Sequence, residues 1–296
     1  MITSKYTVKS NSDYGFFQIS PTPTNEEISK YYADEFYSRS YPRVNNSSLE
    51  FQERDEEYNN SRREDMYDYL NRIFKAPITG MNIFDFGCGW GHNLKFFKDR
   101  GVNCYGCDPA IEAVDYCQSQ GLNVVETKIH TVELFENLKF DVVFLLNVLE
   151  HLANPVETIA EIKKKVLKKN GVLILEVPND FNAFQECAKL VHELPRWWVA
   201  PPAHLNYFNR STLSALLEGE GFEIAHITAT FPMELFLLFG ENYIKNPELG
   251  RACHEKKVTF ETNLKKFGFK QELESFYKSL LDANLGRQIL VYARSI

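Results

Sequence analysis

The sequence lacks the features that are typical of membrane-spanning or secreted proteins and of proteins that bind nucleic acids. No apolar run approaches the roughly 20 residues of a membrane-spanning helix, and no secretory signal opens the chain. Basic residues are in the minority, with 33 Lys and Arg against 40 Asp and Glu, whereas proteins that bind phosphate backbones usually carry a basic stripe. We therefore expect a cytoplasmic protein with no stable membrane insertion and no nucleic-acid partner.

Metal-ligand patterns are scarce as well. Among the six cysteines, Cys104 and Cys107 have a spacing that metal sites use, but both fall in a predicted strand. Residues three apart on a strand point to opposite faces, so these thiols cannot share one centre. No second Cys/His pair lies at zinc spacing, and we predict no metal site and reduced thiols.

A dinucleotide-binding fingerprint is also missing, and a related pattern stands in its place. Residues 85–91 read acidic-x-Gly-x-Gly-x-Gly, between an apolar strand at 82–84 and a helical pattern at 93–97. The G-x-G-x-x-G motif would place a pyrophosphate on a helix N-terminus. Asp85 would repel a pyrophosphate, but it suits the ammonium group of an amino acid. Glycine has no Cβ atom, so a ligand can approach the backbone closely. The turn follows the first strand, and in open parallel sheets adenosine cofactors bind at the carboxyl ends of the strands.

Further elements follow at regular distances. A second strand over 101–108 ends in Asp108, and a carboxylate there can accept both hydroxyls of a ribose. Pro109 is expected at the first position of a helix that runs to Gln120, where its missing N–H costs nothing. The other predicted elements of this region are strands over 122–126, 140–147 and 172–179, and a helix over 155–169.

This order of elements resembles the class I S-adenosylmethionine (SAM)-dependent methyltransferases. The resemblance covers about residues 82–180 and includes the run FDVV…NVLEHL…NP…LKKNGVLILEVPN, which is similar to the small-molecule branch with its ubiquinone and sugar O-methyltransferases. It implies SAM as cofactor and a Rossmann-like α/β fold with a seven-stranded, mostly parallel sheet whose last strand is antiparallel. The residues that the resemblance places at the cofactor are Asp85, Gly87, Cys88, Gly89, Asp108, Pro109, Lys128, Ile129, Asn147, Tyr32 and Tyr37.

The resemblance also suggests a division of the chain. Residues 1–80 would form an N-terminal aromatic lid and helix, residues 81–231 the SAM-binding core with a cap loop at 181–210, and residues 287–296 the last strand. Residues 232–286 are predicted to form a helical insertion that finishes the acceptor pocket or makes a homodimer contact. Tyr32 and Tyr37 would cover SAM, although packing of their rings against the core is the alternative.

The elements expected outside the core are less regular. Met66, Tyr69, Leu70 and Phe74 would face inward from a helix over 61–74. The remaining predictions are helices over 181–194 and 211–217, the latter capped by Ser211, and strands over 222–231 and 288–294.

Methyl transfer from SAM is an in-line displacement, so positioning of the reactants supplies most of the catalysis. A hydroxyl acceptor also needs a group that removes its proton. His204, in an aromatic loop over 195–208, is the first candidate base, and His151 after the fourth strand is the second. Each could equally be a histidine that fixes its loop by hydrogen bonding.

We expect methyl transfer to a hydroxyl of a small molecule such as a sugar, a nucleotide-sugar or another metabolite, with surface-glycan biosynthesis as one setting. N- or C-methylation remains an alternative, as does a catalytically silent scaffold subunit with the same fold.

Overall fold

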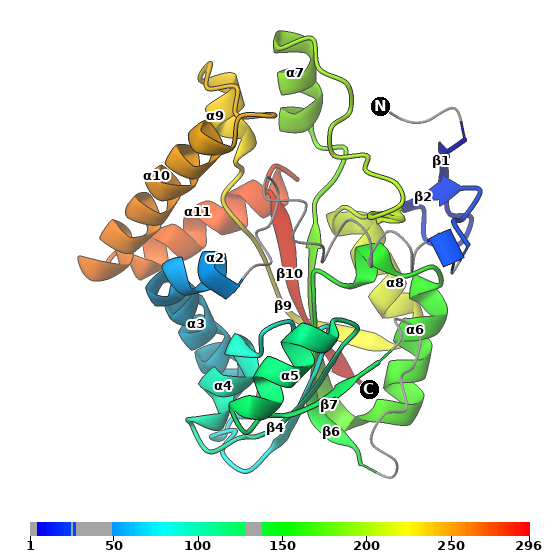
Figure 1. Cartoon of the computed structure of the whole chain (residues 1–296), viewed down its shortest axis with the longest axis vertical. Coiled ribbons are helices and arrows are strands. Elements are labelled where there is room, and N and C mark those ends of the chain that lie inside the picture. Colours follow the sequence, from blue (N-terminus) through cyan, green and yellow to red (C-terminus); the bar gives the residue numbers. More distant parts are fainter. Residues whose placement is uncertain (1–4, 25, 28–48, 128–137) are drawn as a thin grey trace. The chain divides into compact units, whose positions relative to one another are not determined.

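The computed structural model describes residues 5–24, 26–27, 49–127 and 138–296 (Figure 1). Contacts divide the chain into two compact units, one made of residues 45–175, 217–226 and 291–296 and the other of residues 1–44, 176–216 and 227–290. The predicted cofactor residues Tyr32, Tyr37, Lys128 and Ile129 lie outside the described residues.

A seven-stranded sheet has the order β5-β4-β3-β6-β7-β10-β9. Its strands are β3 (Asn82–Phe86), β4 (Asn103–Asp108), β5 (Asn123–Glu126), β6 (Phe140–Leu146), β7 (Leu167–Pro178), β9 (Phe222–Ala229) and β10 (Gln288–Ser295). Strand β3 runs parallel to β4 and β6, with Asp85 opposite Gly106 and Phe144. The sheet is mostly parallel with antiparallel last strands, which confirms the predicted Rossmann-like class.

The central strands were predictable because most of their residues are apolar. Ile83, Phe84, Val142 and Val143 are all buried, as expected for strands that are covered on both faces. Helix α4 packs against β4, and α5 packs against β5 (Figure 1). The sequence order strand, glycine turn, helix, strand therefore fixes the position of the turn at the carboxyl end of β3.

The helices within residues 45–175 differ from the predicted ones at three places, two described here and the third below. Their bounds are α2 (Leu49–Arg54), α3 (Glu56–Phe74), α4 (His92–Lys98), α5 (Ile111–Ser119), η2 (Leu149–His151), α6 (Pro155–Glu161) and η3 (Ile162–Val166). Helix α3 begins earlier than residue 61. Helix α5 begins at Ile111, and not at Pro109, because a carboxylate oxygen of Asp108 accepts the N–H of Ala110 and closes a turn before the helix.

The helix predicted over 155–169 is longer than the helical segment in the structure. The chain passes from α6 into the π-helical turn η3, and β7 already begins at Leu167. The lysine-rich stretch at 163–169 contains no Gly or Pro that would signal an earlier stop, so the pattern favoured a longer helix.

The second unit contains a small sheet that the sequence did not reveal. Strands β1 (Thr7–Ser10), β2 (Phe17–Ser20) and β8 (Asn206–Tyr207) form it in the order β1-β2-β8. Gln18 pairs with Asn206, and its side-chain amide donates a hydrogen bond of 2.9 Å to the Asn206 side chain. Such short strands, far apart in the sequence, have no periodicity to detect.

Helices make up most of the remaining chain. They are α7 (Ala183–Val191), α8 (Arg210–Gly219), α9 (Glu234–Leu238), α10 (Pro247–Lys266) and α11 (Lys270–Asp282). Helix α7 is shorter than predicted because Asn182 and Gln185 form a capping box, while Phe181 has a left-handed backbone with φ of 59°. The cap of α8 is Asn209, whose side chain accepts the N–H of Thr212, so the prediction of Ser211 as the cap was wrong.

Among the helices in the described residues, none is both long and apolar enough to cross a membrane.

Candidate functional site

The glycine turn after β3 is fixed by the end of the neighbouring strand. The backbone N–H groups of Gly87 and Cys88 both donate to the carbonyl of Cys107, at 2.9 and 3.0 Å. Gly91 closes the turn with a 3.0 Å hydrogen bond to the carbonyl of Cys88 and has a φ of 72° at the start of α4. Backbone bonds therefore hold the loop, and the Cys88 thiol adds a contact of 3.8 Å to the carbonyl of Gly89.

The three glycines of the turn serve different purposes. A Cβ atom at Gly87 would lie 2.8 Å from Cγ2 of Val148, and one at Gly91 would lie 2.6 Å from Cδ1 of Leu122. A Cβ atom at Gly89 would have no atom within 4 Å. All three glycines have a positive φ. Packing also restricts Gly87 and Gly91, whereas Gly89 faces open space that a ligand can occupy.

Asp108 ties the turn to the end of β4. Its carboxylate accepts the N–H of Gly89 at 2.8 Å through Oδ2 and the N–H of Ala110 at 2.9 Å through Oδ1. The side chain is buried, and Pro109 lies half-buried between the two residues that it connects. A carboxylate accepts hydrogen bonds at about four lone-pair positions and is a suitable acceptor for ribose hydroxyls. The ribose contact itself stays a prediction.

Asp85 is buried within β3, on the strand that leads into the turn. Its Oδ2 accepts a hydrogen bond of 3.1 Å from the side-chain amide of Asn93. Burial raises the pKa of Asp85 to about 7, and the charge of Asp108 acts in the same direction, while Asn93 and the positive charge of Arg63 oppose the rise. A cationic group placed beside Asp85 would hold it in the charged form.

Arg63, on α3, is the residue that the sequence analysis missed. Its side chain is buried, and its Nη1 donates to Glu56 at 3.1 Å and to Asn60 at 2.9 Å. The charge of Asp85 raises the pKa of Arg63 against the lowering effect of burial, so the two groups interact. A signal was present, because Arg63 shares the helical spacing of the buried Met66 and Leu70.

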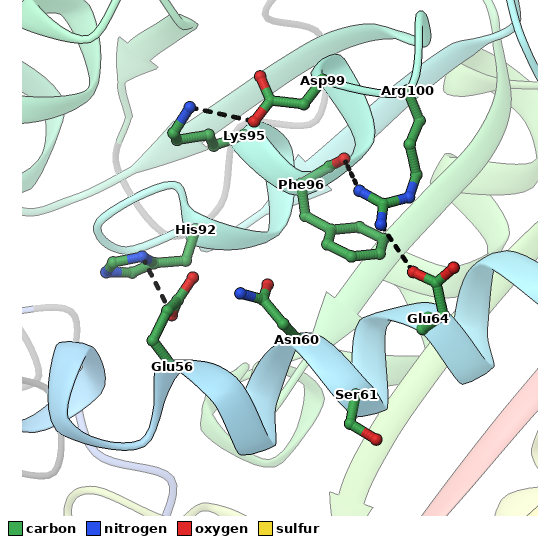
Figure 2. A pocket seen from close by; sticks show the side chains of 9 residues that line it. All are labelled: Glu56, Asn60, Ser61, Glu64, His92, Lys95, Phe96, Asp99 and Arg100. Atoms are coloured by element: carbon green, nitrogen blue, oxygen red, sulfur yellow. Dashed lines mark hydrogen bonds and ion pairs between the residues drawn. The ribbon is translucent and has the colours of Figure 1, made fainter.

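A cavity of about 450 Å³ lies between α3 and α4, and Figure 2 shows its lining. Two ion pairs occupy one side of it, Lys95 with Asp99 at 3.1 Å and Arg100 with Glu64 at 2.7 Å. The acids of this cavity are thus largely matched by bases, and the arrangement does not favour a ligand of one charge.

Glu56 connects this cavity to the glycine turn. One of its carboxylate oxygens bonds to Arg63, and the other lies 3.6 Å from Nδ1 of His92, the first residue of α4 (Figure 2). Burial lowers the pKa of His92. Glu56 therefore positions Arg63 from one side and the helix that follows the glycine turn from the other.

Asn147, predicted to lie at the cofactor, and His151, the second candidate base, both follow β6. Asn147 is exposed and has a left-handed backbone with φ of 57°, a conformation that is often found at functional sites. His151 is half-buried on η2, with its Nε2 atom 3.7 Å from Oε1 of the buried Glu150. Both residues lie just beyond the carboxyl end of their strand, where ligands of open α/β sheets bind.

His204 lies half-buried in the loop between α7 and β8. Its backbone N–H donates to the carbonyl of Ala200 at 3.0 Å, and its carbonyl accepts the Tyr207 hydroxyl at 2.9 Å. The same hydroxyl accepts the N–H of Ala200 at 3.2 Å. The Tyr207 hydroxyl therefore connects two backbone positions of this loop, Ala200 and His204.

The aromatic residues near His204 mainly form a core. Trp198 packs with Tyr6, Ile19 and Tyr207. Nε2 of His192 lies 2.7 Å from the carbonyl oxygen of Leu237, so His192 connects α7 to α9.

A buried polar cluster follows the carboxyl end of β7. Asp180 accepts a 3.3 Å hydrogen bond from Gln185, and its other oxygen has no hydrogen-bond partner among the described residues. Burial raises its pKa to about 7, with Arg287 lowering it and Glu234 raising it. Glu234 is fully buried and bonded to Arg287 through one oxygen, while its second oxygen likewise has no partner in the described chain. Sequence distance concealed this cluster, whose members come from three separate segments.

Comparison with known proteins decides the family. Residues 58–227, more than half of the chain, match the family described as "Methyltransferase domain". The chain belongs to this methyltransferase family. The predicted resemblance to class I SAM-dependent methyltransferases is thereby confirmed.

The similar proteins act on different substrates. The chain is 27% identical over 154 residues to the ubiquinone biosynthesis O-methyltransferase of Caulobacter vibrioides, a match that covers 49% of this chain and 61% of that protein. It is 32% identical over 108 residues to the tRNA U34 carboxymethyltransferase of Pseudoalteromonas translucida, covering 34% of this chain and 33% of that protein. The matches therefore span only part of these relatives.

Among solved structures, the fold is similar to magnesium protoporphyrin IX methyltransferase from Synechocystis PCC 6803, which was determined with bound S-adenosylhomocysteine (SAH). The TM-score is 0.55 at 14% identity, and the match covers 92% of this chain and 100% of that one. At this identity the similarity establishes the fold.

Proposed function

We propose that this protein is a SAM-dependent methyltransferase that acts on a hydroxyl of a small molecule, such as a sugar, a nucleotide-sugar or another metabolite. The observation that carries the proposal is the turn at Gly89, which is open on its ligand side and anchored by the Asp108 carboxylate. Membership of the methyltransferase family supports the same conclusion.

In this proposal each charged end of the cofactor meets a residue of opposite charge. Asp85 would accept the ammonium of the methionine part, and Arg63 would pair with its carboxylate. Asp108 would accept the ribose hydroxyls while it keeps the turn in place. The paired charges suit a zwitterionic amino acid, and they would not suit the diphosphate of a dinucleotide.

The reaction that follows is a displacement at carbon. Bound SAM would supply a methyl group on an activated sulfur. The acceptor oxygen would bond to the methyl carbon as the carbon–sulfur bond breaks, SAH would be the leaving group, and the hydroxyl proton would pass to a base. We assign the base role to His204, with His151 as the second candidate, because a histidine can accept a proton near neutral pH. Two carboxylate oxygens of the buried cluster around Asp180 lack hydrogen-bond donors in the described chain, so this cluster would accept hydroxyl groups of a small molecule.

Ligand-dependent thermal unfolding tests whether SAM is the cofactor. SAM and SAH should each raise the unfolding temperature, and NAD should leave it unchanged. A ligand at a hundredfold excess over its dissociation constant stabilises the native state by about 2.7 kcal/mol. Stabilisation by NAD without any effect of SAH would contradict the cofactor assignment. SAH binding without turnover on any hydroxyl, amine or carbon acceptor would indicate the scaffold alternative.

Arg63→Gln tests the assignment of the cofactor carboxylate. Affinity for SAH should fall roughly 10- to 100-fold, because a hydrogen bond to a charged group contributes about 1.5–3 kcal/mol. Affinity for methylthioadenosine, which has no amino-acid group, should stay the same. Calorimetric titration with both nucleosides measures the difference.

Arg62→Gln is the matched control, because Arg62 precedes Arg63 on α3 and is less buried. It should retain SAH affinity. Equal weakening of SAH and methylthioadenosine by Arg63→Gln would mean that Arg63 supports the fold of the turn and not the carboxylate.

A further inference from the structure

The turn that joins α10 to α11 presents two phenylalanine rings to solvent. Phe267 is 68% exposed and Phe269 is 50% exposed. Between them Gly268 has a φ of 88°, a conformation that glycine adopts without strain. We call residues 265–270 the 265–270 tip.

Hydrogen bonds hold this tip in one shape. The N–H of Phe269 donates to the carbonyl of Leu264 at 2.8 Å, and the N–H of Gly268 donates to the carbonyl of Lys265 at 3.1 Å. This pair of bonds is the Schellman arrangement that ends many helices at a glycine. The rings are therefore displayed by a closed turn, and their exposure follows from the local sequence.

The charged residues nearest to the rings in the sequence are all basic. Lys265, Lys266 and Lys270 flank them, and no acidic residue occurs between Glu261 and Glu272. The Lys266 ammonium lies 5.8 Å from the centre of the Phe267 ring. A basic tip stands out on a chain whose net charge is −7.

We propose that the 265–270 tip docks on the surface of an anionic lipid bilayer. Aromatic rings gain stability at the boundary between headgroups and acyl chains, and lysines beside them are attracted to anionic headgroups. Lysine side chains can also extend their ammonium groups toward the headgroups while their alkyl parts follow the rings. This contact is peripheral and needs no membrane-spanning helix.

Charge and shape favour a bilayer over other partners. A second copy of the chain that paired tip to tip would bring lysines against lysines, which is unfavourable. A single-stranded nucleic acid would need a basic groove with aromatic platforms along it, and the tip is one helix-to-helix turn.

Vesicle co-sedimentation of the full chain tests the proposal. Vesicles of phosphatidylcholine and phosphatidylglycerol in equal parts should sediment the protein, and vesicles of phosphatidylcholine alone should sediment much less. The double variant Phe267→Ser/Phe269→Ser should lower the partition coefficient by roughly tenfold or more, since it removes both rings from the interface. The triple variant Lys265→Gln/Lys266→Gln/Lys270→Gln should remove the preference for phosphatidylglycerol.

Phe239→Ser is the matched control. Phe239 is 73% exposed in the same unit, at the end of α9, and it is followed by Gly240 and Glu241 with no lysine beside it. This variant should sediment like the unsubstituted protein. Thermal unfolding should be the same for all variants, because the substituted side chains are exposed or half-exposed.

Three results would overturn the proposal. The first is failure of the unsubstituted protein to sediment with the anionic vesicles. The second is equal sedimentation of the unsubstituted protein and the double phenylalanine variant. The third is a dimer in sedimentation velocity, or a complex with a single-stranded oligonucleotide, that this variant abolishes while vesicle binding persists.

Discussion

Asp108→Asn should weaken SAH binding by roughly a hundredfold or more. Two ribose hydroxyls would each lose a hydrogen bond to a charged acceptor, and such bonds contribute about 1.5–3 kcal/mol each. The amide of Asn has one acceptor oxygen in place of two. Its NH₂ group would also face a backbone N–H, since Gly89 and Ala110 both donate to the present carboxylate. Calorimetric titration with SAH measures the loss.

Asp108 is expected to bind the ribose and to support the glycine turn, and these two roles can be measured separately. Loss of a backbone bond should lower the stability of the ligand-free variant by about 1–3 kcal/mol, which denaturant unfolding reports. Asp115→Asn, at an exposed position on α5, is the control and should change neither quantity. A variant that is less stable but binds SAH as before would show that Asp108 only supports the turn.

The parts of the fold that were predictable share one property, which is local periodicity. Apolar runs such as 140–146 mark buried parallel strands, and the acidic-glycine turn marks the end of the first of them. Asp85 and Gly89 could be named from this pattern alone. Their surroundings could not, because neither the raised pKa of Asp85 nor the open space beside Gly89 follows from spacing.

The unpredicted parts depend on pairing between distant segments. Strand β8 has two residues and pairs with a strand near the start of the chain. Glu234 and Arg287 meet only because α9 lies close to the start of β10. Arg63 is different, since its position on the inward face was readable, but a buried arginine contradicts the usual distribution of charged residues. A charged residue at an inward-facing position of a predicted helix therefore indicates a buried charge, which the overall composition does not reveal.

His204→Gln should lower the rate of methyl transfer by about 10²–10⁴-fold, the usual contribution of a general base. SAH affinity should remain the same, because His204 is assigned to the acceptor and not to the cofactor. The hydrogen bonds that the Tyr207 hydroxyl makes to the backbone of Ala200 and His204 involve no imidazole atom and should persist in this variant. Steady-state kinetics and SAH titration together measure these effects, with the acceptor that the unsubstituted protein methylates.

Asp180→Asn distinguishes the base from a group that positions the acceptor. Asp180 has a pKa raised to about 7 by burial, so it could itself accept a proton near neutral pH. We expect this variant to raise KM for the acceptor with a small change in kcat, and His254→Gln on α10 to change neither. If Asp180→Asn abolishes turnover while His204→Gln does not, the carboxylate is the base. If both variants retain full turnover, neither group is the base. His151→Gln then separates the second candidate base, whose loss would lower turnover, from an acceptor that needs no base, such as a nitrogen with a free lone pair.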